Sequence, residues 1–301
     1  MNQKKGSPPK SKVQNSDVLS ITLPLINRMT TRGLSDNTIR SYTRTVERLV
    51  RFHDLLHPRD MDIDQVIDFI CHLINVQQIN WRTNKMYVAG LRYYWTEILE
   101  DDTFASRIPY PKEVPSLPKI LSRKELRLLF NSCNNLKHRV IFRLIYSAGL
   151  RRSELLNLKI HDIETSDGKF RIRINNSKGN KDRYTVLSKI VHQELRVYFK
   201  KYQPKVYLFN GRKKGLRLSE GAIRHAMVDA RKRSGITKEV SMHVLRHCFA
   251  THALEHGMHI KRLQQLLGHS TLQTTLIYLQ VSEIPYNKDF SPLDKWDDGK
   301  S

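Results

Sequence analysis

The chain has 301 residues, which is enough for two domains that each bury a core of their own. Lys and Arg number 52 against 29 Asp and Glu, and the formal net charge is +23 at pH 7. A body with that excess repels itself, and a polyanion such as nucleic acid relieves the repulsion, although a basic composition also serves solubility alone. No apolar run reaches the length of a membrane span, so we expect no membrane association.

Residues 1–17 predict a disordered basic arm, because the first 16 hold four lysines and no acid. No apolar segment follows these lysines, so the arm does not resemble a secretory signal. The three cysteines, Cys71, Cys133 and Cys248, are far apart and form no C-x-x-C pair. This spacing argues against a disulfide framework or a zinc ribbon and favours a reducing, cytoplasmic environment.

Residues 18–105 predict a helical domain. Apolar residues recur at helical spacing after Ser35 or Asn37, either of which is placed to cap a helix. Two further stretches with the same periodicity cover residues 63–74 and 81–99. We expect these segments to pack together.

A proline-rich connector, residues 106–121, follows this domain. It contains four prolines within ten residues, a density that prevents a continuous helix and favours an extended linker. Ser122 and Glu125 then form the pattern of a capping box at the start of the next helix. We therefore expect a second domain over residues 122–285 and a C-terminal tail over residues 286–301.

The second domain begins with helices and then contains a hairpin. A helix over residues 136–148 is expected to stop at Gly149. Residues 170–174 alternate as a half-buried strand does, and residues 183–187 form a second strand. The residues between them, 176–182, are typical of a turn.

The remainder of this domain is predicted to be helical. Ser219 is placed to cap one helix, and two others cover residues 242–256 and 261–267. Ser270 opens the pattern of another capping box, which predicts a helix that carries Tyr278. The fold class we expect is mostly α with a small β-hairpin, in two domains.

Seven polar residues stand out beside helix ends and turns in the second domain: Arg151, Glu154, Lys178, His243, Arg246, His269 and Tyr278. These residue types suit transfer of a phosphodiester. Guanidinium groups match the non-bridging oxygens, a tyrosine can act as nucleophile, and lysine or histidine can move protons. Taken singly, each also has an ordinary interpretation as an ion pair, a helix cap, a solvated lysine or a core tyrosine.

Their order along the chain resembles that of the tyrosine recombinases, the family of phage integrases and Xer recombinases. Gly149-Leu-Arg151-Arg-Ser-Glu154 resembles the first arginine motif of that family, and Lys178 to Arg183 resembles its hairpin lysine motif. The remaining motifs are an H-x-x-R box, a histidine box and a tyrosine nine residues later: His243 to Arg246, Leu267-Gly-His269 and Tyr278. Residues 20–105 resemble the core-binding domain of Xer-type recombinases.

The resemblance implies a role for each residue. Tyr278 would attack the scissile phosphate and form a 3′-phosphotyrosine, while Arg151 and Arg246 bind its non-bridging oxygens. Lys178 would protonate the departing 5′ oxygen. His243 would act in proton transfer with the nucleophile.

The two remaining residues would support this chemistry, with no metal and no cofactor. His269 would hydrogen-bond the phosphate, and Glu154 would orient Arg151 or His243. The two domains would close as a C-shaped clamp around duplex DNA.

The partners implied by the resemblance are a double-stranded DNA recombination site and further copies of this chain. A homotetramer, with a dimer on each site, would exchange strands, and we expect it to work in the bacterial cytoplasm at the nucleoid. Phe290, Leu293 and Trp296 would anchor an exchanged C-terminal tail, or else fold back on their own domain. Whether the reaction serves integration, excision, inversion or dimer resolution stays open.

Two other functions compete with this hypothesis. One is a catalytically silent DNA-binding regulator on the same fold. The other is a metal-dependent nuclease, because His243, His247, His252 and His256 lie close in sequence. No acidic residue completes an H-E-x-x-H pattern there, so we interpret the last three as helix-surface or DNA-facing residues.

Overall fold

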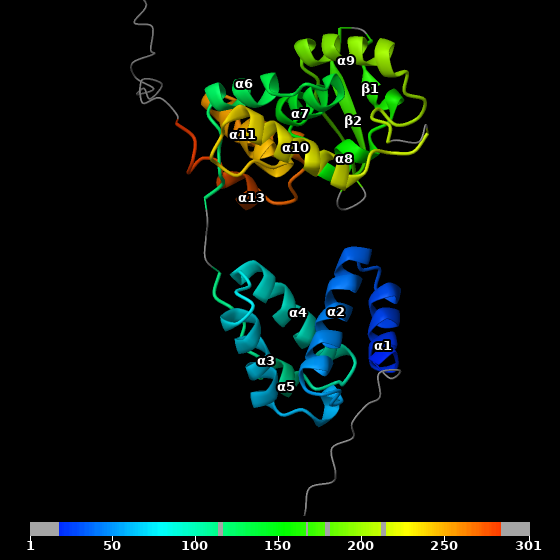
Figure 1. Ribbon diagram of the computed structural model, residues 1–301, viewed down its shortest axis with the longest axis vertical. Coiled ribbons are helices and arrows are strands. Elements are labelled where there is room, and N and C mark those ends of the chain that lie inside the picture. Colours follow the sequence, from blue (N-terminus) through cyan, green and yellow to red (C-terminus); the bar gives the residue numbers. More distant parts are fainter. Residues whose placement is uncertain (1–17, 114–116, 167, 178–180, 212–214, 284–301) are drawn as a thin grey trace, which may run out of the picture. The chain divides into compact units, whose positions relative to one another are not determined.

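A computed structural model describes residues 18–113, 117–166, 168–177, 181–211 and 215–283 (Figure 1). The chain divides between Pro115 and Ser116 into two units, each with a hydrophobic core. Lys178 and the tail from residue 284 onward lie outside the described residues. None of the helices described is both long and apolar enough to cross a membrane.

The first unit is helical, as predicted. Its α-helices are α1 (Val18–Thr31), α2 (Asp36–Phe52), α3 (Ile63–Asn75), α4 (Trp81–Glu97) and α5 (Asp102–Arg107), with one 3₁₀ turn, η2 (Pro58–Asp60). Ser35 caps α2 by accepting the backbone N–H of Thr38. Helix α1 contains Pro24 and α5 is short, and neither is predicted from the sequence pattern.

Residues beyond 105 still pack on the first unit. Ile108 is fully buried, and its carbonyl accepts a hydrogen bond from Nε of Arg92 at 2.9 Å. On the other side of the division, the backbone N–H of Leu121 donates to Sγ of Cys248 at 3.2 Å. Each end of the proline-rich stretch is therefore attached to the unit beside it.

The second unit combines helices with one small sheet. Its elements are α6 (Arg123–Asn131), α7 (Leu136–Ala148), α8 (Arg152–Asn157), η3 (Ile160–Asp162), β1 (Ile163–Glu164), β2 (Arg171–Ser177), β3 (Lys181–Val186), α9 (Lys189–Tyr202), α10 (Glu220–Ser234), α11 (Met242–Glu255), α12 (Ile260–Leu267) and α13 (Gln273–Leu276). The sheet is antiparallel in the order β1-β2-β3, and Ile172 pairs with both Ile163 and Thr185.

Helix α11 lies at the centre of this unit. It packs against α7 and α12, and its buried residues occupy all sides of the helix. A helix of this kind is buried among its neighbours instead of lying on the surface. One of its buried residues is Arg246, so a charged side chain enters the core and requires partners there.

The predicted capping box at Ser270 is wrong. Helix α13 starts after Leu272, which makes no side-chain cap, and it ends at Leu276. Its first turn is set by the Leu272 carbonyl, which accepts from Thr275 and Leu276. Tyr278 consequently lies in the turn that follows the helix, with its N–H bonded to the carbonyl of Thr275 at 3.1 Å.

Candidate active site

The turn between α7 and α8 places Arg151 and Glu154. Helix α7 ends at Gly149, whose φ of 63° is left-handed, and Arg151 is the N-cap of α8. A Cβ at Gly149 would lie 2.4 Å from Phe249, so only glycine fits this close approach. The carboxylate of Glu154 accepts the backbone N–H of Arg151 at 2.7 Å, which closes the first turn of α8.

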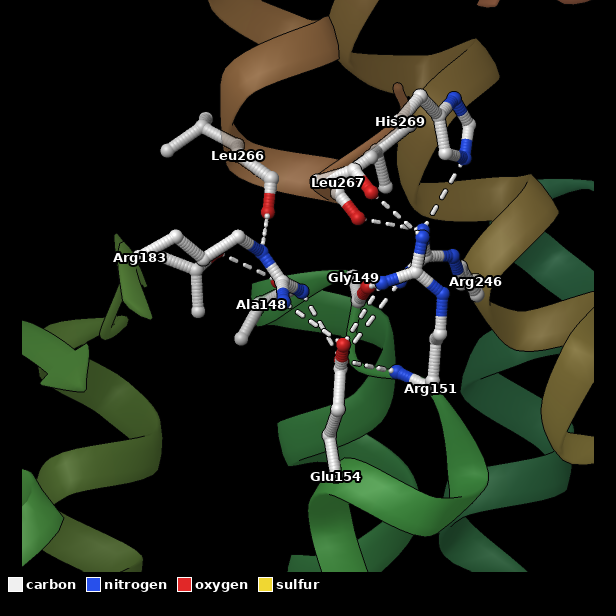
Figure 2. A network of polar contacts seen from close by, with 11 residues as sticks. Ala148, Gly149, Arg151, Glu154, Arg183, Arg246, Leu266, Leu267 and His269 are labelled. Atoms are coloured by element: carbon white, nitrogen blue, oxygen red, sulfur yellow. Dashed lines mark hydrogen bonds and ion pairs between the residues drawn. The ribbon is translucent and has the colours of Figure 1, made fainter. Parts of the chain in front are cut away.

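The Glu154 carboxylate binds the guanidinium groups of Arg151 and Arg183 (Figure 2). Arg183, from β3, donates to both carboxylate oxygens at 2.7 and 2.9 Å, and Arg151 donates to one of them at 2.8 Å. Burial opposes the ionisation of Glu154, but the hydrogen bonds and charge of Arg183, with help from Arg151, outweigh it and lower the pKa to about 2. Glu154 is therefore a carboxylate at any physiological pH.

Arg246 enters the same network from α11, although its side chain is only 2% exposed (Figure 2). It donates to the carbonyl of Gly149 at 2.6 Å, to the carbonyl of Leu267 at 2.7 Å and to Nε2 of His269 at 3.1 Å. Burial and the charge of Arg151 lower its pKa to about 10, so it remains a cation at neutral pH. Three arginines thus converge on one buried carboxylate: Arg151, Arg183 and Arg246.

His269 follows the glycine that ends α12. Its Nε2 accepts from Arg246, so its Nδ1 carries the proton and donates to the hydroxyl of Thr275 at 2.9 Å. Burial, followed by the charges of Arg246 and Arg151, lowers the pKa of His269 to about 3, which keeps the ring neutral. The ring of His269 lies nearly parallel to that of Tyr278, with the centroids 6.3 Å apart.

Tyr278 is 3% exposed and packs in a small apolar cluster. Its Oη lies 2.9 Å from Nδ1 of His247, which is on α11. Burial raises the pKa of the phenol, while the charges of Arg246 and Arg151 act in the opposite direction. The phenol therefore stays protonated near neutral pH and lies within the field of both arginines.

The structure joins most of the predicted site residues in one unit. Arg151, Glu154, Arg246 and His269 share a single hydrogen-bond network, and Tyr278 adjoins it through the ring of His269. Of the two residues that Glu154 was expected to orient, it contacts Arg151, and no hydrogen bond or ion pair joins it to His243 among the described residues.

His243 does not reach the phenol directly. Its ring lies edge-to-face against that of His247, with the centroids 4.2 Å apart, and His247 contacts Tyr278 instead. His247 is half-buried, and the interpretation of His252 as a surface residue is wrong. His252 is buried, and its Nδ1 lies 3.0 Å from the hydroxyl of Tyr146.

Sequence reasoning missed two members of the site, Arg183 and His247. Arg183 stands inside the quoted hairpin motif, but nothing in the sequence shows which acid it meets. His247 offered a clearer signal, because it lies four residues after His243 and therefore on the same helix face. Among the residues that the structure describes, no three His, Cys, Asp or Glu side chains gather as a metal site requires.

Comparison with known proteins agrees with this geometry. The family model described as "Phage integrase family" matches residues 118–283, and the one described as "Phage integrase, N-terminal SAM-like domain" matches residues 24–103. The chain belongs to the phage integrase family of tyrosine recombinases. The predicted family is thereby confirmed.

Relatives in this integrase family align along most of the chain. Tyrosine recombinase XerA of Thermococcus kodakarensis is 35% identical over 83% of this chain and 86% of its own length. Tyrosine recombinase XerD of Listeria monocytogenes serotype 4b is 29% identical over 84% of this chain and 91% of its own length.

Solved structures confirm the expected mostly helical fold with a small sheet. A crystal structure of XerA recombinase is 25% identical, covers 87% of this chain and 93% of its own, and has a TM-score of 0.50. XerH site-specific recombinase bound to a palindromic difH substrate is 21% identical, covers 91% of this chain and 88% of its own, and has a TM-score of 0.70. At this identity the likeness to XerH shows the fold alone.

Proposed function

We propose that this integrase-family enzyme cuts and rejoins double-stranded DNA at specific sites through a covalent bond between Tyr278 and a 3′ phosphate. Site-specific recombination is the activity of its tyrosine recombinase relatives, and the chain is an enzyme of that class. One observation supports the chemistry most strongly: the Tyr278 phenol lies beside a buried cluster in which Arg151, Arg246 and His269 converge.

The arginines suit the phosphate. A phosphodiester under attack gains negative charge on its non-bridging oxygens, and guanidinium groups held in place beforehand stabilise that charge at no further cost in reorganisation. Arg246 is held by the carbonyls of Gly149 and Leu267, and Arg151 by Glu154. We propose that both bind the scissile phosphate and that His269 hydrogen-bonds it.

Proton transfer involves two further residues. We propose Lys178 as the acid that protonates the departing 5′ oxygen, although it lies outside the described residues. His243 is proposed to act in proton transfer around the nucleophile, which it approaches through the ring of His247. These side chains supply charge and protons themselves, so the proposed reaction uses no metal and no cofactor.

Strand exchange between two duplexes requires several copies of the enzyme. A lambda integrase of the same fold has been solved as a tetramer bound to a Holliday junction. We propose a homotetramer of this chain, with two copies on each site and a tail from each copy docked on its neighbour. Because DNA is its substrate, we propose that it works in the bacterial cytoplasm at the nucleoid.

Covalent trapping tests the proposed function. DNA fragments that become attached to the wild-type protein are sequenced, which maps the site, and a synthetic duplex with that site is then nicked next to the cleavage point. The wild-type enzyme should remain covalently attached to this suicide duplex, whereas Tyr278→Phe should bind it without attachment. Continued attachment of Tyr278→Phe, or a lack of attachment by the wild-type enzyme, would favour another nucleophile or the silent regulator.

A further inference from the structure

The nucleophile faces a histidine that the motif comparison does not single out. Oη of Tyr278 lies 2.9 Å from Nδ1 of His247, and the two rings are tilted by 51° with their centroids 5.5 Å apart. Among the described residues, this is the hydrogen bond that the hydroxyl makes. A nucleophilic phenol must lose its proton as it attacks, and the atom in place to receive it is Nδ1 of His247.

We propose that His247 is the general base of the reaction: it accepts the hydrogen bond of Tyr278 and takes its proton as Oη attacks the phosphate. This inference rests on the proposed function of Tyr278 as nucleophile. It assigns the direct proton contact to His247, one helical turn after His243, and leaves His243 in a supporting position beside the His247 ring.

The surroundings of His247 keep its ring neutral and ready to accept. Burial, followed by the charges of His243 and Arg246, lowers its pKa to about 4. A neutral imidazole protonated on Nε2 presents a lone pair at Nδ1. In this tautomer of His247, Nδ1 accepts the hydrogen bond of the Tyr278 hydroxyl, as transfer of the phenol proton requires.

A bound phosphate makes the proton transfer feasible. In the free protein, burial of the ring and then the charges of His243 and Arg246 disfavour an imidazolium, so the phenol keeps its proton. The phosphodiester brings a negative charge to Arg246 and Arg151, and this charge grows as the fifth oxygen approaches phosphorus. An anion beside His247 raises its pKa, so the base becomes effective only when the substrate is in place.

The step balances in both directions. The Oη–P bond forms as the P–O5′ bond breaks, and the electron pair of that bond leaves on the 5′ oxygen, which takes a proton from the proposed acid Lys178. The phenol proton moves to Nδ1 of His247. On rejoining, the 5′ hydroxyl attacks the phosphotyrosine, and the imidazolium of His247 returns its proton to the departing Tyr278 oxygen.

Single-turnover cleavage of the nicked duplex bearing the mapped site measures the contribution of the base. His247→Ala and His247→Asn should each cleave roughly 100-fold or more slowly than the wild type, within the range that general bases contribute. Asparagine keeps a polar atom near the position of Nδ1 but cannot take a proton, so it separates base catalysis from placement of the phenol. His225→Asn, at an exposed histidine on α10, is the matched control and should leave the rate unchanged.

A second substrate distinguishes the role of His247 as the base from the role of Lys178 as the acid. With sulfur in place of the bridging 5′ oxygen, the leaving group departs without protonation, so Lys178→Ala should recover most of its rate. The His247 variants should stay slow on this substrate. Their residual rate should rise by about tenfold per pH unit over pH 7–9, because it then depends on the small ionised fraction of the phenol.

Each outcome decides the inference. If His247→Asn cleaves at the wild-type rate, or if the sulfur substrate rescues His247→Ala as it rescues Lys178→Ala, His247 is not the base. If the His247 variants fail to bind the duplex, the residue supports DNA binding and the inference is also lost. Failure of the proposed function is distinct from these results, because it would show in covalent attachment by Tyr278→Phe.

Discussion

Arg183 and Glu154 form a bidentate ion pair, with both carboxylate oxygens bonded at 2.7 and 2.9 Å, across 29 residues of sequence. Arg183 also donates through Nε to the carbonyl of Leu266 at 3.0 Å. One side chain thus ties the β2–β3 hairpin to α8 and to the end of α12 (Figure 2). In the sequence, position 178 of the proposed acid directly follows β2, the strand that pairs with the strand of Arg183.

Replacing Arg183 with Met should destabilise the second unit strongly. The change leaves the Glu154 carboxylate buried with fewer partners, and breaking a buried ion pair from one side costs about 3–5 kcal/mol. Arg173→Met is the matched control, because Arg173 lies on the same hairpin and pairs with Asp182 where both side chains are 48% exposed. The control substitution should leave the free energy of unfolding of the second unit unchanged.

Hydrogen exchange of α11 during urea unfolding of the full chain provides the measurement for these variants. Tryptophan fluorescence is less suitable, because two of the three tryptophans, Trp81 and Trp95, belong to the first unit. If Arg183→Met and Arg173→Met lose protection of α11 at the same urea concentration, the buried pair contributes nothing to stability.

Stability of the second unit should fall in acid because of Glu154. Its pKa is lowered from 4.5 to about 2, so it favours the folded state above pH 4.5, and this contribution of about 3 kcal/mol disappears as the pH falls toward 2. Glu154→Gln lacks this ionisation. The variant should be less stable than the wild type at pH 7, and the gap in urea midpoint should narrow steadily between pH 5 and pH 2. A gap that stays constant over this range would show that the ionisation of Glu154 is not linked to folding.

Gly149→Ala should cost more stability than Gly235→Ala. Both glycines end a helix at positive φ, 63° and 70°, so both substitutions carry the backbone cost of about 1–2 kcal/mol. A Cβ at position 149 would also lie 2.4 Å from Phe249 and 2.9 Å from Leu267, whereas a Cβ at position 235 meets nothing within 4 Å. We expect an additional loss of about 1–3 kcal/mol from overpacking at position 149. Equal urea midpoints for the two variants would show that the core yields to the extra methyl group.

Deleting residues 287–301 tests the proposed tail exchange. The truncated chain should bind one duplex with nearly unchanged affinity, but it should fail to form complexes that hold two duplexes and should not recombine them. Native gel shifts with one and two labelled duplexes measure both properties. If truncation leaves paired-duplex complexes intact, or if it unfolds the second unit, the tail acts locally and the exchange proposal fails.

The amino-acid sequence by itself determined much of the local structure and the identity of the chemistry. Ser35, the capping box at Ser122 and the glycine at position 149 mark helix ends through interactions within a few residues, and the structure has them as predicted. The order of the arginine, histidine and tyrosine motifs indicated the family, which the comparisons confirm. The wrong predictions also arose from local patterns. Pro24 lies inside α1, which was not predicted, and the Ser270 pattern predicted a helix cap that does not form.

Only the tertiary structure decided which side chains meet. The partners of Glu154 come from the N-cap of α8, from β3 and from α11, and the partner of Tyr278 comes from α11, 31 residues earlier in the chain. Helical periodicity shows that His243 and His247 share a face, but it does not show which ring reaches the phenol. That choice depends on how α11 and the turn after α13 pack around a common apolar cluster, because the direction of a buried side chain is set by the neighbours that enclose it.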